Sequence, residues 1–444
     1  MLRLLRVALI VVVLVGLLPA MPATADKTLP PGEALPPGEA LPPGEALPPN
    51  SYCQEIWPSA NEAYLVCVPP DWTGPFDVVV FAHGYVAPNA PPTQYYDQLW
   101  LPGDVFLPYL VNSQGYAFIS TSYSKNGLAV KEGLNDIRSL IKWFKEASPW
   151  AGRPQNAYLI GASEGGLITT LAAEKGAPIV GGLALCGPIG NFRSQINYWG
   201  DFRVLYDYFF PAASYPAIQI PNSPIDINEP VVWPNWDAMS QGIALAVTTD
   251  TAATQQLLAT SRAPIDPADP LSVVSTTVGI LSYNVFATND GKAELNGQPF
   301  DNRFKWYFGS ANDRLLNARV QRFSAELSFA ALLDISRNYQ TTGKLKVPLV
   351  TMHTTDDPIV PYWHETLYNA KALLGGSIFK HLNIPIVRYG HCAFTAQESL
   401  AAFAILHYMV TGHLSEKAPS DLAPAAQEEY QKLIEQFRSQ LDNP

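Results

Sequence analysis

Along the chain from about residue 60, short unbroken apolar runs alternate with longer segments in which apolar residues recur at a helical spacing. Runs at residues 78–82 and 116–121 predict strands that are buried on both faces. Residues 131–147 predict an amphipathic helix, because one stripe holds Leu134, Ile137, Leu140, Ile141 and Phe144. Such alternation predicts an α/β fold, in which helices flank a mostly parallel sheet.

The alternation continues to residue 185, stops, and resumes near residue 347. Before the interruption we predict, in order, a strand at 157–160, a helix at 164–175 and a strand at 179–185. After it we predict strands at 347–352 and 384–388, a closing helix at 395–409 and a polar-faced terminal helix at 428–441. Residues 187–345 therefore interrupt the pattern between the strands predicted at 179–185 and 347–352, which we take as the sixth and seventh strands of the sheet.

The first 25 residues have the pattern of a secretory signal peptide. Arg3 and Arg6 precede an apolar run at residues 8–18, and Ala-Thr-Ala at 23–25 offers the small residues that a signal peptidase requires. The alternative is a membrane anchor, but the apolar run is too short to span a bilayer comfortably. We therefore expect a secreted protein, extracellular or in the cell envelope, without stable membrane insertion after cleavage.

Residues 26–50 repeat the unit Leu-Pro-Pro-Gly-Glu-Ala. Paired prolines fix φ and remove backbone donors, so the repeat cannot form a helix or a sheet ladder. We predict an extended, polyproline-like linker that acts as a solvated tether. A wall-spanning stalk or a ligand for a partner protein is the alternative.

Composition narrows the class of protein further. The chain has 444 residues, of which 48% are hydrophobic and 15% charged, which excludes a disordered tail protein or a coiled coil. Its 28 Lys and Arg stand against 39 Asp and Glu, giving a net charge of -11. So acidic a chain lacks the basic surface that binds nucleic acid or anionic membranes.

The motif at residues 161–166, Gly-Ala-Ser-Glu-Gly-Gly, lies between a predicted strand and a predicted helix. Ser163 would therefore occupy a sharp turn, next to a helix N-terminus that favours negative charge. Small neighbours are needed there because larger side chains would collide. We take Ser163 as a candidate nucleophile, with an ordinary glycine-rich turn as the alternative.

A serine nucleophile requires a base and an orienting acid. Among seven histidines, His391 is the candidate base, because it follows Gly390 in the loop after the last predicted strand. His353 ends a strand beside the candidate acids, and His83 precedes Gly84 after another strand. We expect structural or exposed roles for the remaining four, His364, His381, His407 and His413.

The acid should follow the strand at 347–352, where the chain offers two carboxylates. Asp357 is followed by Pro-Ile-Val-Pro, a rigid loop that would hold its carboxylate toward the histidine. Asp356 is the alternative, and would otherwise cap the turn.

The order Ser163, Asp357, His391 is the order of α/β-hydrolases. Together with the His-Gly pair at 83–84, it makes residues 60–187 and 345–412 resemble secreted α/β-hydrolase esterases and lipases. An oxyanion hole would include the backbone N–H of Glu164, directly after the nucleophile. The resemblance implies that Tyr85 donates the second N–H.

The chain also resembles tannase and feruloyl-esterase-like enzymes, through its size and the cysteine directly after His391. In that group the partner cysteine adjoins the nucleophile, whereas here Ala162 occupies that position.

The four cysteines fit an exported protein and allow three pairings. Cys53 and Cys67 flank a segment that can fold back as a hairpin, which favours a local disulfide. Cys186 and Cys392 both belong to the active-site face, so we hypothesise a bridge that restrains the histidine loop. A seventh strand should lie between the strands that precede these two cysteines. The alternative to a bridge is that both cysteines are buried free thiols.

Residues 187–345 lie where such hydrolases carry a cap, so the resemblance implies a cap or lid. The predicted parts are a signal peptide at 1–25, a linker at 26–50, a hydrolase core at 51–186 and 346–415, the cap at 187–345 and a C-terminal helix at 416–444. Aromatic residues crowd the start of the cap, at Phe192, Tyr198, Trp199, Phe202, Tyr206, Tyr208, Phe209, Phe210, Tyr215, Trp233 and Trp236. They would form the core of the cap itself. Alternatively some, with Tyr198 and Trp199 as candidates, would line a substrate pocket over the nucleophile.

The sequence therefore predicts a secreted serine hydrolase that cleaves carboxylic esters, small or polymeric, through an acyl-enzyme. A serine peptidase or amidase of the same fold is one alternative, and a catalytically dead hydrolase fold that only binds is another. No metal-ligand spacing and no dinucleotide-binding fingerprint is found in the sequence, so we expect neither a metal nor another cofactor.

Overall fold

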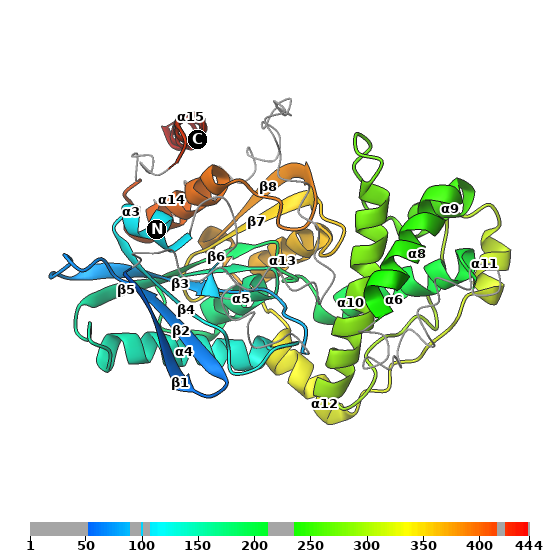
Figure 1. Ribbon diagram of the computed structural model, residues 1–444, viewed down its shortest axis with the longest axis horizontal. Coiled ribbons are helices and arrows are strands. Elements are labelled where there is room, and N and C mark those ends of the chain that lie inside the picture. The colour runs from blue at the N-terminus through cyan, green and yellow to red at the C-terminus, as the bar shows by residue number, and fades with distance from the viewer. Residues whose placement is uncertain (1–51, 89–98, 101–106, 212–234, 415–421, 443–444) are drawn as a thin grey trace.

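The structure is a computed structural model that describes residues 52–88, 99–100, 107–211, 235–414 and 422–442 (Figure 1). The predicted signal peptide and repeat linker lie outside the described residues, as do Tyr215 and Trp233 of the aromatic segment. Within the described ranges, no helix combines the length and the apolar character needed to cross a bilayer.

A single sheet forms the centre of the described chain. Its strands are β1 (Cys53–Ser59), β2 (Glu62–Cys67), β3 (Phe76–Ala82), β4 (Tyr116–Thr121), β5 (Pro154–Ala162), β6 (Gly181–Leu185), β7 (Leu349–Asp356) and β8 (His381–Tyr389). They lie in the order β1-β2-β4-β3-β5-β6-β7-β8. The pairs β1·β2 and β2·β4 are antiparallel and the others are parallel, so the predicted mostly parallel sheet is confirmed.

Helices cover both faces of this sheet (Figure 1). Those outside the insertion are α3 (Leu107–Ser113), α4 (Val130–Glu146), α5 (Glu164–Lys175), α13 (Trp363–Leu374), α14 (Ala396–Thr411) and α15 (Pro424–Asp442), with a short 3-10 turn, η5 (Ile378–Lys380).

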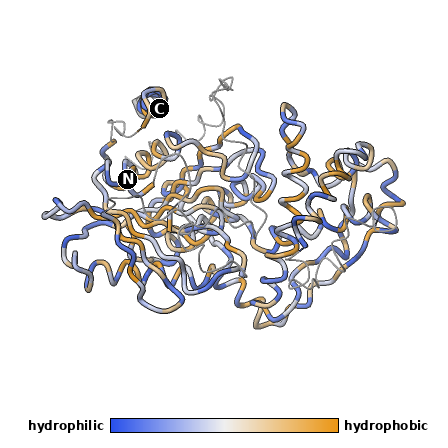
Figure 2. Tube along the Cα trace, viewed as in Figure 1, coloured by the Kyte–Doolittle hydropathy of each residue, from blue (hydrophilic) through white to orange (hydrophobic). Residues whose placement is uncertain are grey.

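The central strands β3, β4 and β6 are buried on both faces, which explains why they read as unbroken apolar runs (Figure 2). In β3, Val78 and Val80 join the apolar core that includes α4 and α5. Val79 and Phe81 point the other way, into the core that includes α14. The two-residue period of a strand thus divides one sequence run between two cores.

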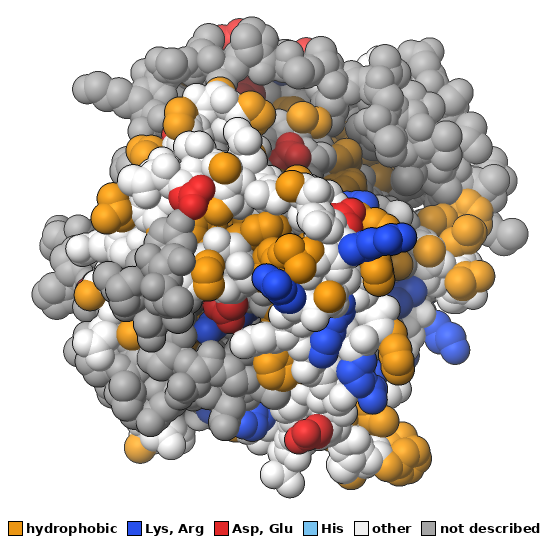
Figure 3. Space-filling view, turned by 90° about the vertical axis from the view of Figure 1, so that its right-hand side faces the viewer, with side chains coloured by type: hydrophobic (Ala, Val, Ile, Leu, Met, Phe, Trp, Pro, Cys, Tyr) orange, Lys and Arg blue, Asp and Glu red, His pale blue; other side chains and the backbone are white. Residues whose placement is uncertain are grey.

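A helical insertion separates β6 from β7 and lies to one side of the sheet (Figure 1), as predicted. It contains α6 (Phe192–Phe209), α8 (Trp236–Thr249), α9 (Thr251–Ser261), α10 (Ser272–Glu294), α11 (Asp313–Arg319), α12 (Phe329–Asp334) and the π-helical turn η4 (Ile335–Tyr339). Phe202, Tyr206 and Trp236 are buried in its core, so these aromatic residues hold the insertion together. On its outer face, basic and apolar side chains lie exposed beside one another (Figure 3).

The last two strands are longer than predicted. β7 continues to Asp356, so His353 lies inside the strand and not at its end. β8 begins at His381, three residues before the predicted strand, and contains Pro385. Because β8 is the edge strand, with only β7 beside it, a proline is tolerated there.

Helix α5 crosses the sheet at very close range. A Cβ on Gly165 would collide with the carbonyl oxygens of Ala82 and His83, at the end of β3. A Cβ on Gly161 would collide with the backbone of Gly165. Only glycine at these positions allows the first turn of α5 to rest on β3 and β5.

We expect Gly165→Ala to lower the free energy of unfolding by about 3 kcal/mol or more, because a backbone clash cannot be relieved by a side-chain rotation. Gly74→Ala is the matched control, since a Cβ on Gly74 meets nothing within 4 Å. Urea unfolding of both variants measures the difference, and equal stabilities would contradict this account of the packing.

Candidate active site

Ser163 occupies the turn between β5 and α5, as the sequence predicted. Its backbone has φ 55° and ψ -117°, a combination that residues other than glycine rarely adopt. Its N–H donates to Leu185 O at 2.9 Å, which ties the turn to β6. This strained strand-to-helix turn is typical of a nucleophile elbow.

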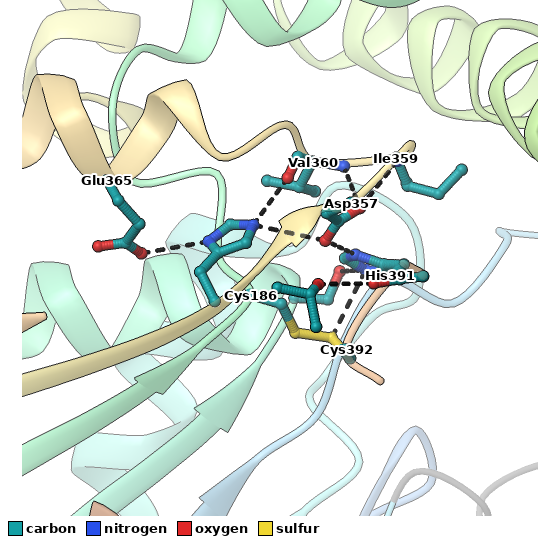
Figure 4. Close-up of a disulfide and its surroundings, with 11 residues drawn as sticks. Cys186, Asp357, Ile359, Val360, Glu365, His391 and Cys392 are labelled. Carbon is teal, nitrogen blue, oxygen red and sulfur yellow. Dashed lines mark hydrogen bonds and ion pairs between the residues drawn. A yellow bond between two sulfur atoms is a disulfide. The ribbon is translucent and has the colours of Figure 1, made fainter. Parts of the chain in front are cut away.

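The structure brings Ser163, His391 and Asp357 into one series of hydrogen bonds. His391 Nε2 lies 2.9 Å from Ser163 Oγ, and His391 Nδ1 lies 2.7 Å from Asp357 Oδ2 (Figure 4). With the proton on Nδ1, Nε2 is free to accept the serine proton. These separations suit general-base activation of a hydroxyl.

The two candidate acids have different environments. Asp357 is fully buried, and its Oδ1 accepts the backbone N–H groups of Ile359 at 2.8 Å and Val360 at 2.9 Å. Asp356 is exposed and accepts a hydrogen bond from the neighbouring Thr355 hydroxyl. Asp357 therefore meets the histidine, and Asp356 does not.

The charge of Asp357 is stabilised by its neighbours. Burial alone would raise the pKa of this carboxyl, but the imidazoles of His391 and His353 outweigh burial and lower its pKa to about 2. Asp357 is therefore a carboxylate at any pH at which the protein would normally be studied, which is the state that can hold an imidazolium.

The strained turn at Ser163, the Ser-Asp-His chain order and the mostly parallel sheet occur together in one known architecture. The chain has the α/β-hydrolase fold. Its sequence matches no protein-family model and no curated protein.

Several solved structures resemble the chain at low sequence identity. Feruloyl esterase B from Aspergillus oryzae is 12% identical and has a TM-score of 0.42, with 83% of each chain covered. Candida antarctica lipase A is 16% identical and has a TM-score of 0.41, with 85% of this chain and 82% of the lipase covered. A Pyrococcus horikoshii acylaminoacyl peptidase is 14% identical, with a TM-score of 0.34 and 76% of this chain but only 37% of its own covered. Likeness at this level carries no information about substrate.

A small, partly open cavity of about 50 Å³ lies beside Ser163. Its walls are mostly apolar and come from both the sheet domain and the insertion. Tyr85 and Glu164, which the sequence proposed as oxyanion donors, both line it. The further lining residues that matter here are Leu167, Ile196, Trp199 and Tyr283.

The two aromatic residues proposed for substrate binding differ in position. Trp199 lines the cavity, and its Nε1 donates to Ile359 O at 3.1 Å. Tyr198 is not among the lining residues; its hydroxyl donates to Pro358 O at 2.8 Å. Both side chains thus tie α6 to the loop that carries Asp357.

Sequence reasoning missed Tyr283, which stacks on Trp199 with ring centroids 5.2 Å apart. Tyr283 lies in α10, far from every motif, in a helix without clear apolar periodicity. Only the packing of α10 against α6 brings it to the cavity.

The side chain of Glu164 is buried next to the candidate oxyanion site. Burial raises its pKa well above the usual range, although the backbone of Ala129 donates a hydrogen bond to it. This shift favours the neutral carboxyl, which places no negative charge where a developing oxyanion would sit.

His83 is buried and stacks on Tyr123, with ring centroids 3.8 Å apart. Burial lowers its pKa to about 4, so the ring is neutral near pH 7. Its Nδ1 donates to Gly84 O at 2.7 Å, which shapes the turn that carries Tyr85. His83 therefore has a structural part and does not contact Ser163 directly.

Both disulfides are confirmed, Cys53–Cys67 across the β1–β2 hairpin and Cys186–Cys392 at the site. Cys186 directly follows β6, and Cys392 follows His391 in the loop after β8 (Figure 4). Strand β7 lies between β6 and β8. Both residues have positive φ, 45° and 53°, so the two loops lean together over the end of β7. The sulfur of Cys392 lies 3.7 Å from His391 Nε2, and the bridge therefore restrains the histidine loop.

One cluster of three potential metal ligands occurs among the described residues, namely Cys186, His391 and Cys392. The two sulfurs are bonded to each other in the disulfide and are not thiolates. The cluster is therefore unsuited to a metal ion.

We expect the double variant Cys186→Ala, Cys392→Ala to lose roughly tenfold to a hundredfold in kcat, because displacing a positioned catalytic group by about 1 Å costs on that order. The double variant Cys53→Ala, Cys67→Ala is the control, since it removes a bridge at the opposite edge of the sheet. It should lower Tm and leave kcat unchanged. Equal losses of kcat in the two variants would show that the bridge at the site acts through stability alone.

Proposed function

We propose that the protein is a secreted serine hydrolase that cleaves carboxylic esters. The observation that carries this proposal is the hydrogen-bonded series Ser163–His391–Asp357 beside a small apolar cavity. The two disulfides support an oxidising compartment, which suits an exported enzyme. The helical insertion, residues 187–345, would act as the cap over the site.

In the proposed reaction His391 Nε2 takes the proton of Ser163 as its Oγ attacks the ester carbonyl. The backbone N–H groups of Tyr85 and Glu164 stabilise the oxyanion that forms, and Asp357 stabilises the imidazolium. His391 then gives its proton to the leaving alcohol as the carbon–oxygen bond breaks. A water molecule, deprotonated by His391, attacks the acyl-enzyme and releases the acid and the free serine.

The size of the cavity supports a small acyl group. A cavity that holds one water molecule has a volume of roughly 10–15 Å³. The cavity beside Ser163, of about 50 Å³, therefore holds a chain of only a few carbon atoms. Among the described residues, those that line the cavity include no Lys or Arg that could hold a carboxylate on the acyl part. We therefore propose esters of short, uncharged acids as substrates, with the alcohol part outside this cavity.

The first experiment compares p-nitrophenyl esters of acetate to decanoate with aminoacyl anilides. We expect turnover of the short esters, loss of nearly all turnover in Ser163→Ala, and loss of fluorophosphonate labelling in the same variant. Labelling that persists in Ser163→Ala would assign the nucleophile elsewhere. Turnover of anilides in preference to esters would favour the amidase alternative. If neither substrate is turned over, the result would favour a binding protein.

The second experiment separates the two acids. Asp357→Asn should cost on the order of 10⁴ in kcat, because the amide favours the wrong tautomer of the base. Asp356→Asn should cost less than threefold, since the exposed Asp356 side chain does not contact His391. The reverse ranking of the two kcat values would disprove the assignment of the acid.

A further inference from the structure

Behind Asp357 lies a second histidine that the proposed mechanism does not use. His353 is fully buried in β7, and its Nε2 lies 2.7 Å from Val360 O and 3.4 Å from Asp357 Oδ2. Its Nδ1 lies 3.2 Å from Glu365 Oε1, on α13 (Figure 4). Both ring nitrogens of His353 therefore face oxygen atoms that accept hydrogen bonds.

The partners of Glu365 show which group carries the proton. Glu365 is fully buried, and its Oε2 accepts the hydroxyl of Thr351 at 2.6 Å and the amide of Asn383 at 2.8 Å. Oε2 thus has two donors, which leaves Oε1 to accept a hydrogen bond from His353 Nδ1. A neutral His353 would turn a ring lone pair toward a carboxylate or a carbonyl oxygen, which is unfavourable in a buried site.

We propose that His353 is a buried imidazolium held by Glu365, and that this ion pair positions Asp357 and sets the charge that His391 experiences. The proposal rests on the proposed function, because it assigns His353 and Glu365 as positioning residues for the same reaction.

The balance of charges agrees with this assignment. Burial opposes protonation of His353, but the hydrogen bonds and charges of Asp357 and Glu365 outweigh burial and raise its pKa to about 10. In the resting enzyme two carboxylates then face one imidazolium. When His391 takes the serine proton, it becomes a second imidazolium. The two carboxylates, Asp357 and Glu365, are then balanced by two imidazolium groups, and these four side chains carry no net charge.

The remaining groups around His353 are uncharged. His364 on α13 accepts the N–H of Gly190 and bonds Gln195, and burial lowers its pKa well below the usual value. Burial also lowers the pKa of His381 on β8, to about 4. Tyr362, from the loop before α13, presents its ring to His353 edge-on at 5.9 Å. The charge acting on Asp357 from behind is therefore that of His353 and Glu365.

The ionic state can be measured without any substrate. In protein labelled with ¹⁵N-histidine, NMR at pH 8 should show one ring, absent from His353→Gln, with both nitrogens protonated. A neutral tautomer at His353 would overturn the proposal. This readout is independent of esterase activity, so it separates failure of this inference from failure of the proposed function.

The pH dependence of kcat/KM tests the effect on the base. His353→Gln removes a positive charge near Asp357, which stabilises the protonated base and should move the acid limb of the profile to higher pH by roughly one unit. Glu365→Gln removes a negative charge and keeps the shape of the side chain, so the acid limb should move to lower pH provided that His353 keeps its proton, which the same NMR measurement on this variant reports. A purely structural role would lower kcat in both variants without moving the limb in opposite directions.

His381→Gln is the matched control, because it removes a buried neutral histidine that contacts Thr351 but not Asp357. It should lower Tm and leave the acid limb in place. If His353→Gln does not fold, Glu365→Gln and the NMR measurement on the native chain still decide the question. Limb shifts of the same sign in both variants, or no shift in either, would overturn the proposal.

Discussion

The close contact of α5 with the sheet is the constraint on which the site depends. Gly161 and Gly165 let the helix begin directly on the ends of β3 and β5, with no side chain between the backbones. The chain can enter the helix at that distance only through a tight turn, which forces positive φ on Ser163. The same contact fixes the end of β3, from which the His83–Gly84 turn carries Tyr85 toward the serine. The candidate nucleophile and the candidate oxyanion donors therefore share one structural cause.

The opposite side of the site depends on how side chains hold the loop after β7. Asp357 is fixed at one oxygen by two backbone N–H groups and at the other by two imidazoles. Trp199 and Tyr198 bind the carbonyl groups of the same loop from α6. The insertion therefore helps to hold the loop that carries the acid, besides supplying a wall of the cavity.

The sheet, the turn at Ser163 and the order of the three candidate catalytic residues could be read from the sequence because each depends on local pattern. Apolar runs reveal strands that are buried on both faces, and small residues reveal a turn that cannot hold larger ones. Contacts that arise only from the packing of distant segments could not be predicted in this way. Tyr283 comes from a helix without a motif, and the contact of His353 with Asp357 depends on β7 extending further than its apolar run. The first residues of β8 were not predicted, because they precede the apolar run and include the polar His381 and Asn383.

The Cys186–Cys392 bridge joins residues that are 206 positions apart in sequence, and everything between them, including the whole insertion, forms one closed covalent loop. In the oxidised chain the ends of β6 and β8 stay neighbours even when the protein is unfolded, so much of the entropy of closing that loop is lost before folding begins. That loop also contains β7, α13 and β8, so one bond lowers the conformational entropy of the unfolded insertion and of the strands beside it together.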